Sequence, residues 1–450
     1  MDDHSTLIPF PGEAPEETAL PVPGQPLETQ PDAPQKVLLL GIDLGQYDAE
    51  RSMAELAALA EANGMEPVAE LLQKRQKPDP ATQLGAGRLA EAKLLAANLG
   101  AGWAIFDGEL SGSQLRNLEN HLKIPVLDRT LLILAIFKNR ATTREGKLQT
   151  ELATLEYRLP RLAGLGTALS RQGGGGAGGG GARRGGGETM LEYDRRYIRS
   201  RIAVLKRRLA ALEKQRDETR RSREKSGVPL VALVGYTNVG KSSLVNALTG
   251  SAIGAADMLF ATLDPTARRL TLPDGLGVVL VDTVGFVSRL PHKLVEAFKS
   301  TLEAAKYADL LLLVCDAADP EAQTQLAITG EVLADLGIGA YVPRLIVYNK
   351  CDKVLGFTPF DAAALAVSAH TGEGLPRLLQ AITDALAARM RRLKLLLPYG
   401  KLALADTLRS HGAVTREDFR ADGVYYEANV EAARAHLFEP YLCYLEETET

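Results

Sequence analysis

The pattern of apolar and polar positions predicts alternating strands and helices near the start of the chain. The apolar run "KVLLLGI", which begins at Lys36, predicts a buried strand, and "AERSMAELAALAEA" after it has helical periodicity. "WAIFDG" and "PVLD" indicate further strands, with the helical pattern "SQLRNLENHL" between them. This alternation predicts a small N-terminal α/β domain over residues 36–128.

A pattern with a different period follows, on both sides of a glycine-rich run. Five leucines and then five further aliphatic residues step by alternating intervals of four and three: Leu148, Leu152, Leu155, Leu159 and Leu162, then Ile198, Ile202, Leu205, Leu209 and Leu212. This spacing is that of the a/d seam of a two-stranded coiled coil, so an antiparallel helical hairpin is predicted over residues 129–227. Pro160 ends the first helix, the second runs from about Thr189 to Ser226, and the glycine-rich loop 173–187 lies at the tip.

The two ends of the chain have other patterns. Residues 1–34 hold eight prolines, seven acidic residues and no Lys or Arg, which predicts a disordered tail over residues 1–35. Residues 228–392 again alternate buried strands and helices, and residues 393–450 combine a helix, a turn and alternating strands. The predicted fold is a multidomain α/β chain: the N-terminal domain, the hairpin, a Ras-like domain over 228–392 and a small C-terminal α/β domain.

Composition narrows the class of protein. Hydrophobic residues make up 46% and charged residues 24%, as in ordinary soluble proteins, and no apolar run approaches the ~20 residues that span a bilayer. The acidic start "MDDHSTLIPF" differs from the basic start of a secretory signal. Cys315, Cys351 and Cys443 lie far apart without metal-ligand spacing. We therefore expect a cytoplasmic protein with no membrane-spanning segment, and a monomer.

Charge is distributed unevenly along the chain. The net charge is −4, yet residues 171–223 hold 15 Arg and Lys against 6 Asp and Glu, a local charge of +9 that leaves −13 for the rest. A basic stretch on an acidic chain favours a polyanionic partner at one place. A solvated helix face is the other interpretation.

The strongest chemical signal is a phosphate loop. "LVALVGYTNVGKSSLVNAL" places G-x-x-x-x-G-K-S between an apolar strand and an amphipathic helix, the context that this motif requires. Backbone N–H groups of the loop and the helix N-terminus would hold phosphates, with Lys241 on the β- and γ-phosphates and Ser242 on Mg²⁺. The expected contacts are Gly235, Tyr236, Thr237, Asn238, Val239, Gly240, Lys241, Ser242 and Ser243.

Further motifs follow in the order that a guanine-nucleotide site needs. "GVVLVDTVGF" is a buried strand ending in Asp282, which can hold Mg²⁺ through water, and the N–H of Gly285 can face the γ-phosphate. "NKCD" offers the Asp352 carboxylate to guanine N1–H and the 2-amino group, while "VSAHTGEGL" supplies a backbone N–H for O6. The expected contacts here are Asp282, Thr283, Val284, Gly285, Asn349, Lys350, Cys351, Asp352, Ser368, Ala369 and His370.

Several longer stretches, between Lys36 and Leu396, closely resemble the HflX family of P-loop GTPases. They are "LFATLDPTARRL", "DTVGFVSRLPHKLVEAFKSTLE", "KPDPATQLGAGR", "RATTREGKLQTELATLEYRLPRL" and "GETMLEYDRRYIRSRI". The resemblance implies a GTPase that binds the large ribosomal subunit and its rRNA and splits or rescues stalled ribosomes, with the hairpin loop reaching towards the peptidyl transferase centre. It also implies that Thr262 is the switch threonine, which binds Mg²⁺ together with Ser242, and that Phe260, Ala261, Thr262, Leu263 and Asp264 line the nucleotide. The glycine run is longer than the family's, and the acidic tail is additional.

The expected catalytic groups are Lys241, Thr262 and Gly285, and a water-orienting side chain is missing from its usual place. Many relatives have glutamine after the glycine of the DxxG motif, but here Phe286 follows Gly285 and cannot orient a water molecule. Phe286 either packs passively beneath the switch or gates it, and His292 is either a polar participant or a surface residue. Asn238 either helps to bind a monovalent cation such as K⁺, as in related GTPases, or braces the loop. We expect slow intrinsic hydrolysis of GTP to GDP and phosphate, stimulated by the ribosome.

Two other functions remain open from the sequence. One is a signalling or regulatory GTPase whose hairpin binds a protein. The other is an RNA-remodelling NTPase with a second nucleotide site in residues 36–128, although no second phosphate loop occurs there. The sequence also leaves open whether splitting requires hydrolysis or only GTP binding.

Overall fold

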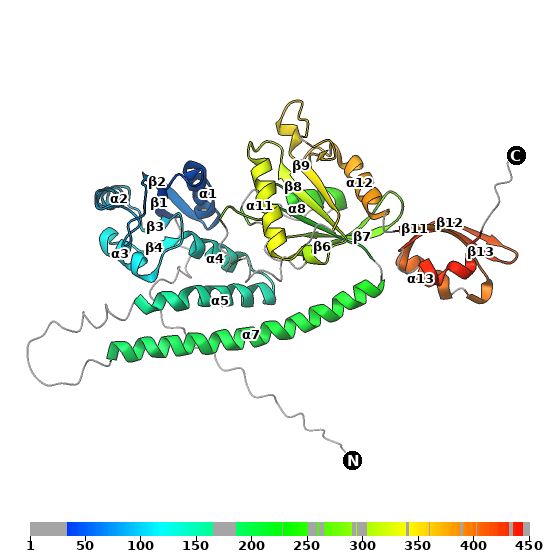
Figure 1. Cartoon of the computed structure of the whole chain (residues 1–450), viewed down its shortest axis with the longest axis horizontal. Coiled ribbons are helices and arrows are strands. Elements are labelled where there is room, and N and C mark those ends of the chain that lie inside the picture. The colour runs from blue at the N-terminus through cyan, green and yellow to red at the C-terminus, as the bar shows by residue number, and fades with distance from the viewer. Residues whose placement is uncertain are drawn as a thin grey trace, which may run out of the picture.

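A computed structural model shows an elongated chain of several α/β bodies, so the predicted multidomain α/β fold is confirmed (Figure 1). It describes residues 34–164, 186–226, 228–250, 259–260, 265–289, 294, 304–338, 342–359, 361–387, 390–401, 403–431 and 435–443. Within these residues, none of the helices combines the length and apolar character needed to cross a bilayer.

The N-terminal body is a four-stranded parallel sheet with strand order β2-β1-β3-β4. Its strands are β1 (Gln35–Asp43), β2 (Met65–Lys74), β3 (Trp103–Phe106) and β4 (Val126–Asp128), and its helices are α1 (Ala49–Ala62), α2 (Ala86–Leu99), α3 (Gly112–Leu122) and α4 (Arg129–Arg140). Alternate residues of β1 face opposite layers. Leu39 packs with α1 and α4, whereas Leu38 packs with α2 and α3.

Helix α4 belongs to the core of this sheet. Ile133, Ile136 and Phe137 are buried in the same cluster as Val37 and Leu39. The boundary expected at residue 128 therefore falls just before a helix that the N-terminal sheet buries, because almost every residue of "TLLILAIF" is apolar and no exposed face remains.

The hairpin consists of α5 (Arg144–Arg158), the 3-10 helix η1 (Leu159–Gly164) and α7 (Gly186–Ser226). α5 and α7 lie side by side (Figure 1), and Glu145 pairs with Arg216 while Glu156 pairs with Lys206, so the two helices are antiparallel. Leu205 is fully buried on α7. The glycine-rich loop expected at the tip lies outside the described residues, apart from its last two positions, which begin α7.

The seam on the first helix differs from the prediction. α5 ends at Arg158, so Leu159 and Leu162 lie in η1, and Leu152 and Leu155 are only half-buried. The buried face of α5 instead contains Ala153 and Tyr157, which join the N-terminal core. The helix is packed on two sides, and a heptad pattern describes only one of them.

The central body is a six-stranded sheet with order β10-β9-β8-β5-β7-β6, parallel except for β6. Its elements are β5 (Leu230–Gly235), α8 (Lys241–Thr249), β6 (Thr266–Thr271), β7 (Gly277–Asp282), β8 (Leu310–Asp316), α11 (Ala322–Asp335), β9 (Arg344–Asn349), η2 (Cys351–Lys353), β10 (Leu365–Ala366) and α12 (Leu375–Ala387). Its core joins β5, β7 and β8 to apolar residues of α8, α11 and α12. The carboxyl ends of β5, β7 and β9 carry the sequence motifs.

The last body is an antiparallel sheet with order β11-β13-β12 and its own core around Tyr426 and Phe438. It contains β11 (Met390–Leu397), η3 (Tyr399–Lys401), α13 (Ala403–His411), β12 (Gly412–Arg420), β13 (Gly423–Glu431), η4 (Ala435–Leu437) and η5 (Glu439–Tyr441).

Candidate nucleotide-binding site

The phosphate loop connects β5 to α8, as its motif predicts, and both of its glycines are required by geometry. Gly235 has φ +154°, and a Cβ there would lie 2.2 Å from the carbonyl oxygen of Val314. Gly240 has φ +84°, and a Cβ there would lie 2.4 Å from Nδ2 of Asn349. The loop is therefore held against β8 and the guanine motif too closely for any side chain at either position.

Lys241 is held beneath the loop by carbonyl groups. Its Nζ donates hydrogen bonds to the carbonyl oxygens of Gly235 at 3.1 Å and Tyr236 at 2.7 Å. The side chain is buried, and desolvation lowers the pKa of Lys241 to about 8, against the opposing effect of Asp282. A phosphate placed over the loop would raise this pKa again and stabilise the charged ammonium.

Ser242 and Asp282 bring together the oxygens that a Mg²⁺ site of this kind needs. The Ser242 hydroxyl donates to Oδ2 of Asp282 at 2.6 Å, and Asp282 is buried at the end of β7. A hydroxyl ligand beside a carboxylate that can act through water suits a hard, oxygen-seeking cation. Ser243 follows in the first turn of α8.

The DxxG segment lies directly on the phosphate loop. The backbone N–H of Thr237 donates to the Phe286 carbonyl at 2.7 Å, and the N–H of Phe286 donates to the Gly235 carbonyl at 3.1 Å. A Cβ on Gly285 would lie 2.7 Å from Cα of Thr237 and 2.9 Å from Nζ of Lys241, so only glycine fits. Phe286 is buried in the core of the central sheet, which places its ring away from the phosphate loop's open side.

The guanine motif braces the phosphate loop. Nδ2 of Asn349 donates to the Val239 carbonyl at 2.9 Å, and Nζ of Lys350 donates to the Asn238 carbonyl at 2.7 Å. Lys350 also forms a 2.8 Å ion pair with Asp316 at the end of β8. Two segments that are far apart in the sequence thus hold each other in place at the carboxyl ends of the strands.

Asp352 lies on the exposed side of this motif as an ionised acceptor. A hydrogen bond from the buried Ser368 lowers the pKa of its carboxyl group further below its usual range and fixes one of its oxygens. The N–H of Ala369, expected to meet guanine O6, donates to Oδ1 of Asn349 at 3.0 Å in this structure. His370 is exposed, and Cys351 is half-buried with a raised pKa.

Some expected residues lie elsewhere or outside the described chain. Ala261, Thr262, Leu263, Asp264 and His292 fall outside it. Phe260 packs edge-on against Phe137 of α4, with 4.6 Å between ring centroids, and Val284 joins the same N-terminal core. The Thr283 hydroxyl donates to the Leu233 carbonyl at 2.6 Å, which ties β7 to β5.

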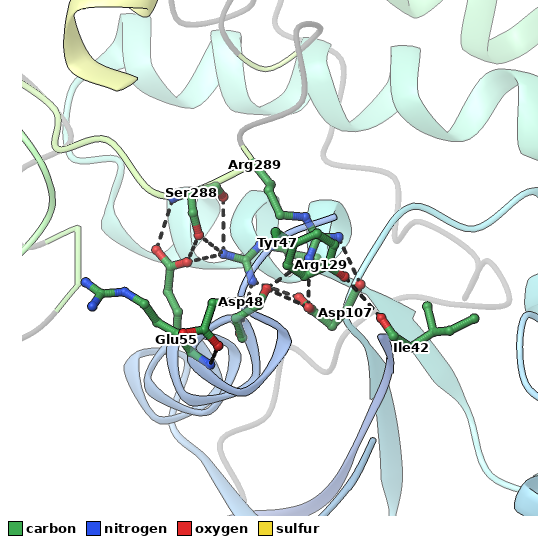
Figure 2. Close-up of polar contacts among 10 residues, drawn as sticks. Ile42, Tyr47, Asp48, Glu55, Asp107, Arg129, Ser288 and Arg289 are labelled. Atoms are coloured by element: carbon green, nitrogen blue, oxygen red, sulfur yellow. Dashed lines mark hydrogen bonds and ion pairs between the residues drawn. The ribbon is translucent and has the colours of Figure 1, made fainter. Parts of the chain in front are cut away.

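A polar cluster that no sequence motif predicted joins the N-terminal body to the residues after Gly285. Figure 2 shows Glu55 and Arg129 of the N-terminal body meeting Ser288, with Asp107 and Arg289 beside them. Tyr236 of the phosphate loop lies next to this cluster. The pKa of its hydroxyl is raised mainly by burial and also by the nearby Glu55 carboxylate. The one signal in the sequence was a charged residue, Arg129, just before the apolar stretch 131–137 of α4.

Comparison with known proteins matches four successive segments of the chain to models of GTP-binding proteins. Family models match residues 50–138 (GTP-binding GTPase N-terminal), 140–223 (GTP-binding GTPase Middle Region), 230–350 (50S ribosome-binding GTPase) and 359–448 (HflX C-terminal domain). The GTPase HflX of Caldanaerobacter subterraneus subsp. tengcongensis is 45% identical over 88% of this chain and 91% of its own length, and that of Escherichia coli is 41% identical over 87% and 92%. A GTP-binding protein from Sulfolobus solfataricus, solved with GDP, is 25% identical over 79% of this chain and 99% of its own, with a TM-score of 0.42. The chain belongs to the HflX family and is a GTP hydrolase.

Proposed function

We propose that this GTPase binds the large ribosomal subunit through rRNA and splits or rescues stalled ribosomes. The match of residues 230–350 to a 50S ribosome-binding GTPase model supports the ribosome as the partner. The observation that carries the proposal is the hairpin, because a guanine-nucleotide switch needs a long, stiff element to act at a distance.

The hairpin has the length and surface for this task. The 41 residues of α7 extend over about 62 Å at 1.5 Å per residue. Tyr193 and Tyr197 are 66% and 64% exposed, and Arg196 and Arg199 are exposed beside them. Exposed aromatic rings that alternate with arginines suit the stacking and phosphate contacts of single-stranded or looped RNA. Ion pairs from Glu151 to Arg201 and from Glu156 to Lys206 hold this helix on α5.

In the reaction, the described groups have roles that fit their positions, whereas the role of Thr262 rests on the family resemblance. Lys241 and the loop N–H groups neutralise charge on the β- and γ-phosphates, and the N–H of Gly285 binds the γ-phosphate. Ser242 and Thr262 would hold Mg²⁺ directly and Asp282 through water, and the ion would supply further charge neutralisation. Asn238, whose φ of +62° turns the loop, would help to bind K⁺.

The water-orienting group is not supplied by Phe286, which is buried. Intrinsic hydrolysis is therefore slow, on the order of 10⁻⁴ to 10⁻² s⁻¹, and the ribosome completes the site with a gain of roughly 10³- to 10⁵-fold. A hydrolysis rate that purified large subunits leave unchanged would reject this role for the ribosome.

The deciding experiment replaces residues 173–187 with a short turn in the full-length chain. Splitting of intact ribosomes is followed by light scattering, with GTP and with a non-hydrolysable analogue. The expected result is loss of splitting with nucleotide affinity unchanged, because the nucleotide site lies in another body. Normal splitting by the variant would exclude the hairpin tip as the acting element. Splitting by the unaltered chain with the analogue would show that hydrolysis only resets the protein.

A further inference from the structure

We propose that Glu55 and Arg129 of the N-terminal body are positioning residues for the GTPase site: they hold the segment that senses the γ-phosphate, residues 285–289, called here the sensor segment. The inference rests on the proposed contact between Gly285 and the γ-phosphate. It concerns the position of the Gly285 N–H, and the part of the chain that fixes this position.

Every polar group of Ser288 is bound by a side chain of the N-terminal body. Its backbone N–H donates to Oε1 of Glu55 at 3.1 Å, and its hydroxyl donates to Oε2 of the same carboxylate. Nη2 of Arg129 donates to the Ser288 carbonyl and hydroxyl oxygens, both at 3.2 Å (Figure 2). Ser288 is therefore fixed in position and orientation by α1 and α4.

The groups that hold Ser288 are themselves held rigidly. Arg129 is buried, and its guanidinium also donates to Oε2 of Glu55 at 2.6 Å and to Oδ1 of Asp107 at 2.8 Å. Arg289 donates to the other oxygen of Asp107 at 2.9 Å and stacks on the ring of Tyr47. Arg129 and Asp107 are almost fully buried, whereas Glu55 and Arg289 are partly exposed, so removing the charge of Glu55 leaves the buried Arg129 with one carboxylate instead of two.

The other end of the sensor segment is fixed to the phosphate loop. Phe286 exchanges backbone hydrogen bonds with Gly235 and Thr237, whereas the neighbouring Val287 is buried in the N-terminal core. Gly285 is only three residues from Ser288, and an extended chain spans at most about 3.5 Å per residue. Only Phe286 and Val287 lie between Gly285 and Ser288, so a shift of Ser288 acts on the backbone next to Gly285.

This arrangement makes a specific link between nucleotide state and the N-terminal body. The Gly285 N–H is placed for the γ-phosphate, which GTP has and GDP lacks. A Gly285 N–H that is held in the right position strengthens GTP binding. By thermodynamic linkage, bound GTP then strengthens the contacts of Glu55 and Arg129 with Ser288. The residue before Arg129 extends the link to the hairpin, because Asp128 accepts a 2.5 Å hydrogen bond from Tyr157 of α5.

The test compares affinities for GDP and for a non-hydrolysable GTP analogue in full-length variants. Ser288→Ala removes only the hydroxyl, and Glu55→Gln keeps the size of the side chain while removing its charge. Each should lower the ratio of analogue to GDP affinity about five- to tenfold, the lower range of typical coupling between sites. GDP affinity stays unchanged, which also shows that the variants are folded.

Arg51→Gln is the matched control. Arg51 also crosses between the two bodies, with 3.0 Å and 3.1 Å ion pairs to Asp319 and Glu321, but it does not contact the sensor segment. Its affinity ratio should equal that of the unaltered chain. An equal shift in Arg51→Gln would mean that any loosening of the bodies has this effect, and would overturn the specific role of Glu55 and Arg129.

Gly285→Ala separates failure of the inference from failure of the underlying site. Its Cβ would collide with Thr237, so it should lower affinity for the analogue. If Gly285→Ala lowers the ratio while Ser288→Ala and Glu55→Gln leave it unchanged or raise it, the positioning role is wrong and the site stands. If Gly285→Ala also leaves the ratio unchanged, Gly285 is not the γ-phosphate contact, and both fall.

Discussion

Single groups at the nucleotide site are tuned by their immediate neighbours. A hydrogen bond from Ser368 lowers the pKa of the Asp352 carboxyl group, and burial lowers the pKa of Lys241 to about 8. The first effect favours a charged acceptor for guanine, and the second leaves a cation that is most stable when phosphates surround it. The first effect bears on which base is bound, and the second on how nucleotide affinity depends on pH.

Asp352→Asn should change the preferred base. The variant presents a donor where guanine also has a donor, its 2-amino group, whereas xanthine has an oxygen there. GTP affinity should fall about 10- to 100-fold, in line with the loss of a charged hydrogen bond, and xanthosine triphosphate should bind better than GTP. Fluorescence titration with both nucleotides measures this. Asp384→Asn, on the exposed face of α12, is the control and should bind GTP normally. Undiminished GTP affinity in Asp352→Asn would remove Asp352 from base reading.

Nucleotide binding should take up a proton above neutral pH. The pKa of Lys241 in the empty protein is about 8, and bound phosphates raise it. Binding at pH 8 should therefore take up about half a proton, and affinity for GDP should fall as pH rises from 8 to 9. Calorimetry in two buffers with different ionisation enthalpies measures the uptake. Affinity that is constant across this range, with no proton uptake, would show that Lys241 is already fully charged in the empty protein. Lys93→Met, an exposed change on α2, should leave the uptake unaltered.

At the scale of elements, the hairpin is held by a narrow apolar seam flanked by ion pairs. Leu205 is its fully buried residue on α7, while the pairs from α7 to Glu145, Glu151 and Glu156 lie at the surface. Exposed ion pairs contribute little to stability, typically about 0–1 kcal/mol each. The seam and the packing of α5 on the N-terminal core therefore carry the stability of the hairpin.

Leu205→Ala should loosen the hairpin locally. Removing a buried leucine costs about 2–5 kcal/mol, and the loss should appear as a lower opening free energy for the backbone amides of α5 and α7. Hydrogen exchange followed by mass spectrometry measures it by segment. Leu94→Ala, at a 65% exposed position, should change the exchange of α5 and α7 by little. Equal protection in both variants would mean that the two helices do not stabilise each other.

At the scale of the molecule, one basic segment, residues 171–223, contrasts with an otherwise acidic chain. Residues 171–223 carry +9 in a chain whose net charge is −4. Such a distribution of charge attracts a polyanion to the basic segment and repels it from the acidic remainder of the chain. If the partner is rRNA, binding is driven partly by the release of counterions.

Binding to large ribosomal subunits should weaken steeply with salt. A plot of the logarithm of affinity against that of salt concentration should fall by about 0.7–0.9 units per phosphate neutralised. Arg199→Ala, on the exposed face of α7, should make this slope shallower by about one unit, and Lys93→Ala should not change it. Sedimentation at several salt concentrations measures both. Affinity that is independent of salt would favour a protein partner.

The strand–loop–helix arrangement of the phosphate loop could be predicted from the sequence because it is local. Strand, loop and helix all lie within "LVALVGYTNVGKSSLVNAL". The close contacts that require glycine at 235 and 240 are with Val314 and Asn349, far along the chain, and came only from the structure. The sequence periodicity of α7 is matched by its burial in part, since Leu205 is buried and Ile198, Ile202, Leu209 and Leu212 are half-buried. Local spacing determines such features, since the residues involved lie within a few turns of one another.

The sequence alone thus determined the nucleotide motifs, the alternating α/β pattern and the periodicity of the long helix. Only the tertiary structure decided that α4 is buried in the N-terminal core and that α5 packs on two sides. It also decided the meeting of Glu55 with Ser288, which are 233 residues apart. Such a contact depends on how two bodies dock, and no spacing or periodicity within either segment encodes that arrangement.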